Sequence, residues 1–483
     1  MQYQRNSAKQ MSSTSGTERW RERTPLLTNA ALLMLGAVLL EYTRTGVGEY
    51  SHYVHGFSET VLVQIALYLG AIIVVELCPT NNWTLRIILL VALAARLIAI
   101  VAPPFLSTDI YRYVWDGLVQ RAGINPFRYI PADSHLRFLR DTSVYPHINR
   151  REYAHTIYPP GSQMIFWVVA AIRPTVTAMK FAMLGFEAAT TYVLIRCLKL
   201  LHARTERVLL YAWSPICLWE IASSGHIDAA ALTFICLALL ALLSGHEKWA
   251  GGWLGAATLI KLYPLALLPA LLWMRRLRAS GVWVTLGVIA AGYCFYLRRG
   301  VSVFGFLPTF AQEEGMQNGT RYFPLAFIER HLRMTIPTSA YLVLCAVVFG
   351  ALVWQTLRRN LAPRDCVFSG LVLATTLTLF FSPHYPWYFL WLLPFVTLRP
   401  WPPALFLATA PTYLLTTKLG VPGEPMYRLN CFLYGGFFIL LACGWLSHRL
   451  PKLSVQKVKE GLAAALVTGA RNSRHEVSVQ EER

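Results

Sequence analysis

The chain has 483 residues, of which 55% are hydrophobic and only 14% are charged. This composition is too apolar for an ordinary soluble domain, so we expect an integral membrane protein. The formal net charge of +19 could suggest a nucleic-acid partner, but Lys and Arg cluster in short segments between apolar runs. That distribution is typical of the cytoplasmic loops of a membrane protein, and we therefore expect no nucleic acid.

Apolar runs near the roughly 20 residues that a helix needs to cross a bilayer recur along the chain. Backbone groups in hydrocarbon must be satisfied within each segment, which predicts an all-α, polytopic transmembrane helical bundle. With the basic segments held inside, the pattern predicts about 12 spans, near residues 26–43, 61–78, 85–103, 177–196, 208–222, 228–244, 280–297, 338–357, 366–381, 385–398, 402–418 and 429–447.

This topology divides the chain into a transmembrane domain, residues 26–448, between two cytoplasmic tails, residues 1–25 and 449–483. The first tail is basic and leads directly into an apolar run without an evident cleavage site, so we interpret it as an anchor and not as a signal peptide. The two longest polar stretches, residues 104–160 and 298–337, are predicted to lie on the external face.

Two segments do not fit simple crossings. Met164–Ile172 is too short, and we expect a re-entrant or interfacial helix. Residues 251–273 carry Lys261 and Pro264 at their centre. A charge is costly at the middle of a spanning helix and an interior proline breaks the hydrogen-bond ladder, so these residues are predicted to form two half-helices that enter and return.

The first external loop carries the most polar candidates. Asp109 and Asp116 are seven residues apart, with Arg112 between them, so on a helix the two carboxylates would share a face. They could line a site. An amphipathic interfacial helix with its aromatic residues at headgroup depth is an equally good interpretation of the same pattern.

The sequence resembles the bacterial polyprenyl-phosphate-mannose-dependent mannosyltransferases, within the GT-C class of membrane glycosyltransferases. The phrases that carry the resemblance lie between residues 107 and 388 and are Thr108-Asp109-Ile110-Tyr111-Arg112-Tyr113-Val114-Trp115-Asp116-Gly117, Gly123 to Pro126, Tyr158-Pro159-Pro160, Gly225-His226-Ile227-Asp228, Lys261-Leu262-Tyr263-Pro264 and His384-Tyr385-Pro386-Trp387-Tyr388.

The resemblance implies a GT-C fold and an external active site whose early loop supplies a catalytic acid, and Asp109 matches that position. Asp109 follows the third predicted span, whereas the class usually has the acid after the first, so either two N-terminal spans are additional or the predicted span count is wrong. A carboxylate in this role would accept the proton of the attacking sugar hydroxyl. The leaving lipid phosphate needs cations or fixed donors, for which the candidates are Arg112, Lys261, His384, Arg321 and Arg428.

The remaining predicted substrate-binding residues are Asp116, Tyr158, His226, Asp228 and Tyr385. Simpler interpretations stay open for several candidates. His226 and Asp228 could cap the following helix, and His384 with Tyr385 could form a tight turn between two prolines. Arg321 and Arg428 could be solvated loop charges. Lys261 differs, because an ionisable residue within a membrane is a functional hypothesis by default.

The expected function is transfer of a hexose, with mannose favoured, from a polyprenyl-phosphate donor to a lipid- or glycan-linked acceptor at the external face of a bacterial inner membrane. Nucleotide sugars are absent from that face, which favours a lipid-borne donor. We predict no cofactor and no metal, because the spacing of the carboxylates and His384 matches no ligand pattern. The alternatives are a membrane transporter, a ligase that uses a lipid-linked glycan, and a non-catalytic scaffold.

Overall fold

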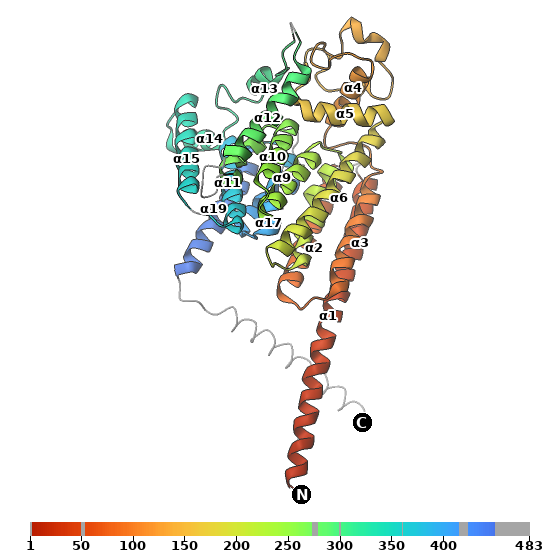
Figure 1. Ribbon diagram of the computed structural model, residues 1–483, viewed down its shortest axis with the longest axis vertical. Coiled ribbons are helices and arrows are strands. Elements are labelled where there is room, and N and C mark those ends of the chain that lie inside the picture. The colour runs from red at the N-terminus through yellow and green to blue at the C-terminus, as the bar shows by residue number, and fades with distance from the viewer. Residues whose placement is uncertain are drawn as a thin grey trace.

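The structure is a computed structural model that describes residues 2–49, 54–272, 279–298, 301–359, 361–414 and 424–449. The described residues form helices and their connections, without a strand, and the chain builds an elongated bundle (Figure 1). The predicted C-terminal tail lies outside the described residues except for Arg449. Within the described residues, seven helical segments are long and apolar enough to cross a membrane: Pro25–Gly48, Gly56–Leu77, Asn82–Ala99, Val176–Leu200, Thr338–Arg358, Pro363–Phe381 and Met426–Ser447.

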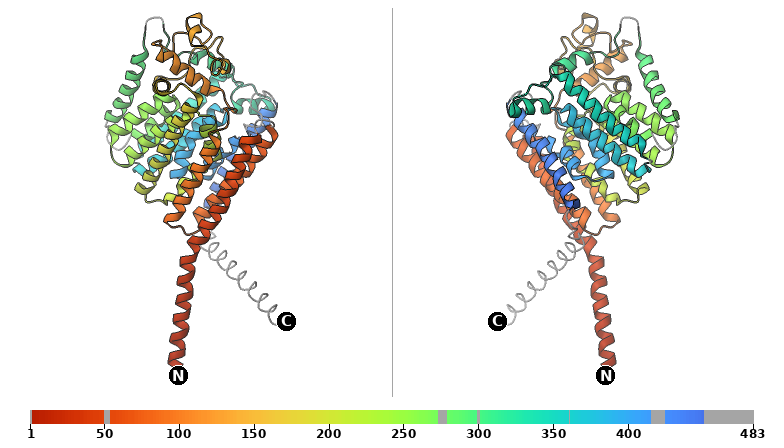
Figure 2. Two further views of the ribbon diagram at one scale, coloured as in Figure 1. Left: turned by 90° about the vertical axis from the view of Figure 1, so that its right-hand side faces the viewer. Right: turned by 90° about the vertical axis from the view of Figure 1, so that its left-hand side faces the viewer.

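Three antiparallel helices open the chain: α1 (Gln2–Glu49), α2 (Val54–Leu77) and α3 (Asn82–Ala99). The tight turn into α3 is fixed by a capping box in which Asn81 and Thr84 exchange hydrogen bonds. The first predicted span lies within α1, and the N-terminal part of this helix projects beyond the bundle in both views of Figure 2.

The first polar loop folds over one end of the bundle, which we call the upper end. It contains α4 (Asp109–Arg121) and the short 3₁₀ turns η1 (Ser134–Leu139) and η2 (Tyr145–His147), and it leads into α5 (Pro160–Ile172). α5 lies across the bundle beneath α4 (Figure 1). Gly117 permits this contact, because a Cβ there would lie 2.4 Å from the Phe166 carbonyl oxygen.

The next part of the chain is one long helix followed by broken ones. α6 (Val176–Leu200) runs away from the upper end, and the chain returns through η3 (Thr205–Val208), α7 (Leu209–Ala212), α8 (Pro215–Cys217) and the π-helical turn η4 (Leu218–Ser223). The predicted span at 208–222 is thus not one continuous helix. Pro215 cannot donate a backbone hydrogen bond, and the π turn changes the helical register.

Residues 247–296 run toward the upper end, reverse direction, and then run toward the upper end again. α9 (Asp228–Leu243) is followed by α10 (Glu247–Ile260), η5 (Tyr263–Leu267), α11 (Leu268–Leu272) and α12 (Ala279–Tyr296). Gly251 lies against Gly281, and Gly292 lies against Leu259, so α10 and α12 run parallel. The chain therefore reverses direction between α10 and α12, through η5 and α11, and the placement of this pair in a membrane stays a prediction.

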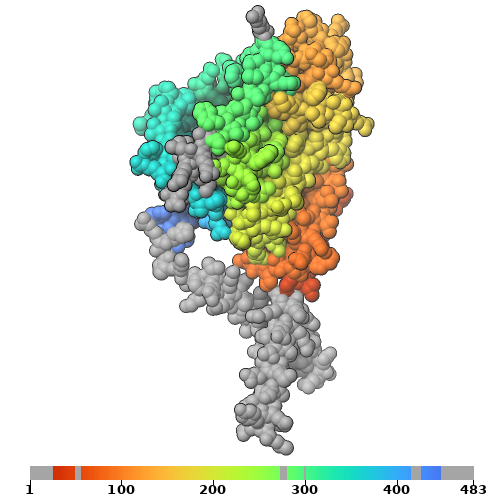
Figure 3. Space-filling model, viewed as in Figure 1, coloured from red at the N-terminus to blue at the C-terminus, as the bar shows by residue number. Residues whose placement is uncertain are grey.

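The last third of the chain completes the bundle with α13 (Leu307–Glu313), α14 (Phe323–Leu332), α15 (Thr338–Arg358), α16 (Pro363–Phe381), η6 (Pro386–Leu392), α17 (Leu393–Leu398), α18 (Pro402–Leu414) and α19 (Glu424–Arg449). Figure 3 shows the first polar loop and the residues that follow α12 packed together at the upper end. The hydrogen bond from Asn125 to the carbonyl of Tyr296, the last residue of α12, joins the loop to this helix.

The predicted count of about 12 spans is not confirmed by the seven long apolar helices. Several other predicted spans are short helices, among them Asp228–Leu243, Ser280–Tyr296 and Pro386–Leu398. Prolines account for much of the difference, since Pro215, Pro386, Pro394 and Pro402 each stand at the first or second position of a helical segment and so divide the apolar runs.

Candidate active site

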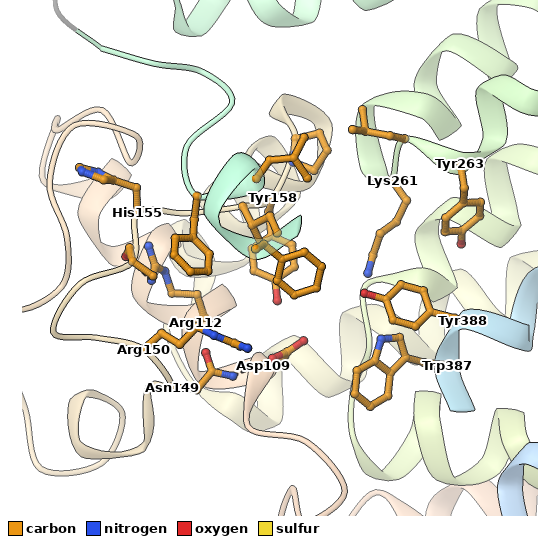
Figure 4. A pocket seen from close by; sticks show the side chains of 17 residues that line it. Asp109, Arg112, Asn149, Arg150, His155, Tyr158, Lys261, Tyr263, Trp387 and Tyr388 are labelled. Carbon is orange, nitrogen blue, oxygen red and sulfur yellow. Dashed lines mark hydrogen bonds between the residues drawn. The ribbon is translucent and has the colours of Figure 1, made fainter. Parts of the chain in front are cut away.

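A pocket of about 230 Å³ opens at the upper end of the bundle, where α4, the irregular loop before α5, the turn after α10, the start of α13 and η6 meet (Figure 4). Its walls come from five segments of the sequence. The volume is just below the roughly 300–1,000 Å³ of drug-sized ligand sites, so it suits a small polar headgroup.

Asp109 stands on one wall, at the first residue of α4. Its backbone N–H is bound by the Ser107 hydroxyl, and its carboxylate accepts a 2.9 Å hydrogen bond from Asn149. The N-terminus of a helix favours a negative charge, which suits an ionised carboxylate at this position. One carboxylate oxygen is thus oriented by Asn149.

Arg112 also lines the pocket, but Asp116 lies behind it. The Asp116 carboxylate is 2% exposed and accepts hydrogen bonds from Arg112 at 2.8 Å, Thr156 at 2.5 Å and Gln163 at 2.9 Å. Arg112 donates in addition to the Ala154 carbonyl. The shared helical face therefore does not bring both carboxylates into the pocket, and Asp116 holds Arg112 in place.

Tyr158 closes the same wall and packs edge-on against Tyr113 with ring centroids 4.9 Å apart. Burial, and then the charge of Asp109, raises the pKa of Tyr158 well above that of a free phenol. The hydroxyl therefore stays protonated and points toward the carboxylate side of the pocket (Figure 4).

Lys261 faces Asp109 from the opposite wall (Figure 4). The residue ends α10 in an extended conformation, and the helix break turns its side chain into the pocket. Its ammonium lies 3.2 Å from the Asp228 carboxylate, which also accepts a 3.2 Å hydrogen bond from Tyr263. Asp228 is completely buried, whereas the Lys261 side chain is 16% exposed, so the cation keeps access to the pocket.

Aromatic side chains form the floor beside Lys261. Trp387 and Tyr388 line the pocket from η6, and the Lys261 ammonium lies 5.8 Å from the Tyr388 ring centroid. Trp387 stacks on His226 at 4.4 Å and on Tyr385 at 4.6 Å. Neither His226 nor Tyr385 lines the pocket, and the buried His226 lies 3.2 Å from Glu220 of the π-helical turn.

Several lining residues were not predicted from the sequence. Asn149 and Arg150 come from the irregular part of the first loop, and Phe306 and Phe310 come from the segment around α13. Arg150 forms a 2.8 Å ion pair with Glu313, which ties the two polar loops together. Irregular loops have no periodicity to reveal which side chains point inward. The only indication that the two loops could meet was that both were predicted to lie on the external face.

The other predicted site residues do not line the pocket. Arg321 is buried, forms an ion pair with Glu314 and donates to the Phe381 carbonyl at 3.1 Å. Burial, and then the charge of Arg321, lowers the pKa of His384. Arg428 is exposed on α19. Arg321, His384 and Arg428 thus stay predictions as ligand-binding residues.

Among the described residues, no group of three or more His, Cys, Asp or Glu side chains is arranged to hold a metal ion. Asp109 and Asp228, which could have converged on a metal, are bound to Asn149 and to Lys261 with Tyr263 respectively.

Residues 156–383 match the model of a family described as Glycosyltransferase family 87. The matched segment covers a little under half of the chain and includes Tyr158, Asp228 and Lys261, while Asp109 lies before it. No curated protein and no solved structure shows a significant match to the chain. The family match indicates a glycosyltransferase, and the seven long apolar helices indicate an integral membrane protein.

Proposed function

We propose that the protein transfers a hexose, with mannose favoured, from a polyprenyl-phosphate donor to a lipid- or glycan-linked acceptor. The observation that carries this proposal is the placement of a carboxylate, Asp109, and a cation, Lys261, on facing walls of one pocket (Figure 4). Glycosyl transfer from a phosphate needs both a proton acceptor and a stabilised leaving group.

Asp109 is the general base in this mechanism. An acceptor hydroxyl attacks the anomeric carbon, the bond from that carbon to the phosphate oxygen breaks, and the hydroxyl proton moves to Asp109. Because one oxygen of the carboxylate is held by Asn149, the other can face the acceptor. A positioned base of this kind contributes roughly 10²–10⁴-fold to the rate.

Lys261 receives the leaving phosphate. Its ammonium has three N–H donors and forms an ion pair with Asp228 at 3.2 Å. The pair keeps the lysine charged and fixed in a partly buried position, where a charge-assisted hydrogen bond to phosphate is strong. Arg112, which Asp116 orients from behind, supplies a second cation on the Asp109 side of the same pocket.

The aromatic floor and the position of the pocket favour a lipid-borne donor. Trp387, Tyr388, Phe306 and Phe310 line the pocket with aromatic surface, so a sugar ring and the first isoprene unit of the tail both find apolar partners. Asp109, Arg112, Tyr158, Phe306 and Phe310 come from the two loops predicted on the external side of a bacterial inner membrane, where a lipid-borne sugar is available and a nucleotide sugar is not.

Transfer by the purified protein in liposomes tests the proposal. The donors are labelled polyprenyl-phosphate mannose and, separately, labelled GDP- and UDP-sugars, with an extract of envelope lipids and glycans as the acceptor. We expect transfer from the lipid donor alone. Efficient transfer from a nucleotide sugar without a lipid intermediate would contradict the proposed function. Accumulation of untransferred donor inside the liposomes would also contradict it, because that is the result expected of a transporter. A ligase would move only a preassembled glycan.

A further inference from the structure

A second pocket, of about 500 Å³, lies at the end of the bundle opposite the candidate active site. α6 begins near the upper end, where Lys180 binds the Ile100 carbonyl, and Leu201 follows its far end. α16 runs the other way, from Arg364 to Phe381 near Arg321. Leu201 and Arg364 both line the second pocket, and they are joined by a hydrogen bond. We call this the lower pocket.

Three arginines from separate segments line the lower pocket: Arg207, Arg364 and Arg399. Arg207 is held by a two-point ion pair with Glu76, with bonds of 2.7 and 2.9 Å, and Arg364 donates a 2.6 Å hydrogen bond to the Leu201 carbonyl. The Arg399 guanidinium makes no hydrogen bond or ion pair with the residues that the structure describes. Arg207 and Arg364 are thus fixed in place, and the guanidinium of Arg399 is available to bind a ligand.

The lining contains no carboxylate in the described part of the chain, so Glu76 offsets only one of the three charges. Net positive charge in a pocket calls for an anion. Arginine is well matched to phosphate, since its planar donors can bind two phosphate oxygens at once.

Apart from His202, the rest of the lining is apolar. Val367, Phe368 and Leu398 belong to helices of the bundle, and Trp401 packs edge-on against Phe368 with ring centroids 5.8 Å apart. Tryptophan is enriched where a membrane protein meets the lipid headgroups. An apolar wall that ends in arginines and a tryptophan presents the two surfaces that a phospholipid needs, one for its phosphate and one for the start of its acyl chains.

We propose that the lower pocket binds the phosphate headgroup of an anionic phospholipid of the surrounding bilayer. Basic pockets between membrane helices bind such headgroups on the cytoplasmic side, and the basic segments around Arg207, Arg364 and Arg399 are those predicted to be cytoplasmic. The site is separate from the candidate active site, and its lipid is a structural ligand and not a substrate.

Native mass spectrometry of the purified full-length protein tests the proposal. The probes are phosphatidylglycerol, phosphatidylcholine with the same acyl chains, and soluble glycerol 3-phosphate. We expect phosphatidylglycerol to bind at least about tenfold more tightly than phosphatidylcholine, and Arg399→Gln to weaken the phosphatidylglycerol site about fivefold, as expected for loss of one arginine near an anionic lipid. Arg364→Gln with Arg399→Gln should weaken it further.

Arg196→Gln is the matched control, because Arg196 is an exposed arginine near the same end of α6 that does not line the lower pocket. It should bind phosphatidylglycerol like the wild type. Unchanged binding in Arg399→Gln and in the double variant would overturn the proposal, and so would equal binding of phosphatidylcholine. Glycerol 3-phosphate binding as tightly as the lipid would overturn the assignment to a membrane lipid. None of these results depends on transferase activity, so the test stands apart from that of the proposed function.

Discussion

Asn149 donates a 2.9 Å hydrogen bond to the carboxylate of Asp109 from 40 residues further along the chain. The two residues approach from different parts of the first polar loop, the one from an irregular segment and the other from the start of α4. A carboxylate held on one side by an amide can turn its second oxygen only toward the pocket. The hydrogen bond from Asn149 thus orients the Asp109 carboxylate for its proposed role as the base.

Asn149→Ala should lower kcat about tenfold and leave the KM for the lipid donor near its wild-type value, because a hydrogen bond to a charged group is worth about 1.5–3 kcal/mol and only part of it acts on the orientation of Asp109. Steady-state transfer kinetics provide the measurement. Asn318→Ala, in the second polar loop and outside the pocket, is the control. An increase in KM with unchanged kcat would mean that Asn149 contacts the donor.

Lys261→Met should raise the KM for the lipid donor far more than the KM for the acceptor, since it removes the cation that faces the leaving phosphate. It also leaves Asp228 buried without its partner, which for a buried pair costs about 3–5 kcal/mol of stability. We expect Lys261→Met with Asp228→Asn to regain thermal stability in detergent but not donor affinity. Recovery of donor affinity in the double variant would show that Lys261 acts only through folding.

Asp116→Asn should destabilise the protein, because the three groups that bind the carboxylate all donate hydrogen bonds and an amide N–H would oppose one of them. Leaving Arg112 without its carboxylate costs about 3–5 kcal/mol if the pair behaves like other buried pairs. The melting temperature in detergent reports this loss. Glu152→Gln, which breaks an exposed ion pair in the same loop, should change it by far less. Normal stability with lost turnover would instead place Asp116 in the chemistry.

His384 should make stability depend on pH. Burial, and then Arg321, lowers its pKa in the folded protein, whereas in the unfolded chain it titrates near about 6.5. Between these values the unfolded state binds more protons, so stability is lost as the pH falls through this window. His384→Gln should therefore flatten the fall in melting temperature between about pH 7 and about pH 5. An unchanged slope in His384→Gln would contradict the prediction.

The helical fold could be predicted from the sequence, because apolar runs indicate membrane helices. Asp109 and Lys261, on the two facing walls of the candidate site, could also be predicted, because they are polar residues that border or interrupt such runs. Lys261 and Pro264 interrupt an apolar run, and the helix breaks there. The seven-residue spacing of Asp109 and Asp116 indicated a common face, but it could not show that Arg112 and Thr156 would engage Asp116.

Contacts between distant segments could not be predicted in the same way. Arg96 and Glu187 are 91 residues apart, and each stands within a span, yet they form a buried ion pair of 2.6 Å. Neither was singled out from the sequence. Nothing local to either residue reveals the other, because the pairing depends on how α3 and α6 pack.

The most direct test of the account compares transfer from polyprenyl-phosphate mannose by the purified wild-type protein and by Asp109→Asn in the same liposomes. The variant keeps the shape of the side chain and its position at the start of α4. We predict unchanged expression, melting temperature and donor binding, with turnover reduced by about 10²–10⁴-fold, as expected for loss of a general base. Near-normal turnover by Asp109→Asn would show that Asp109 is not the base.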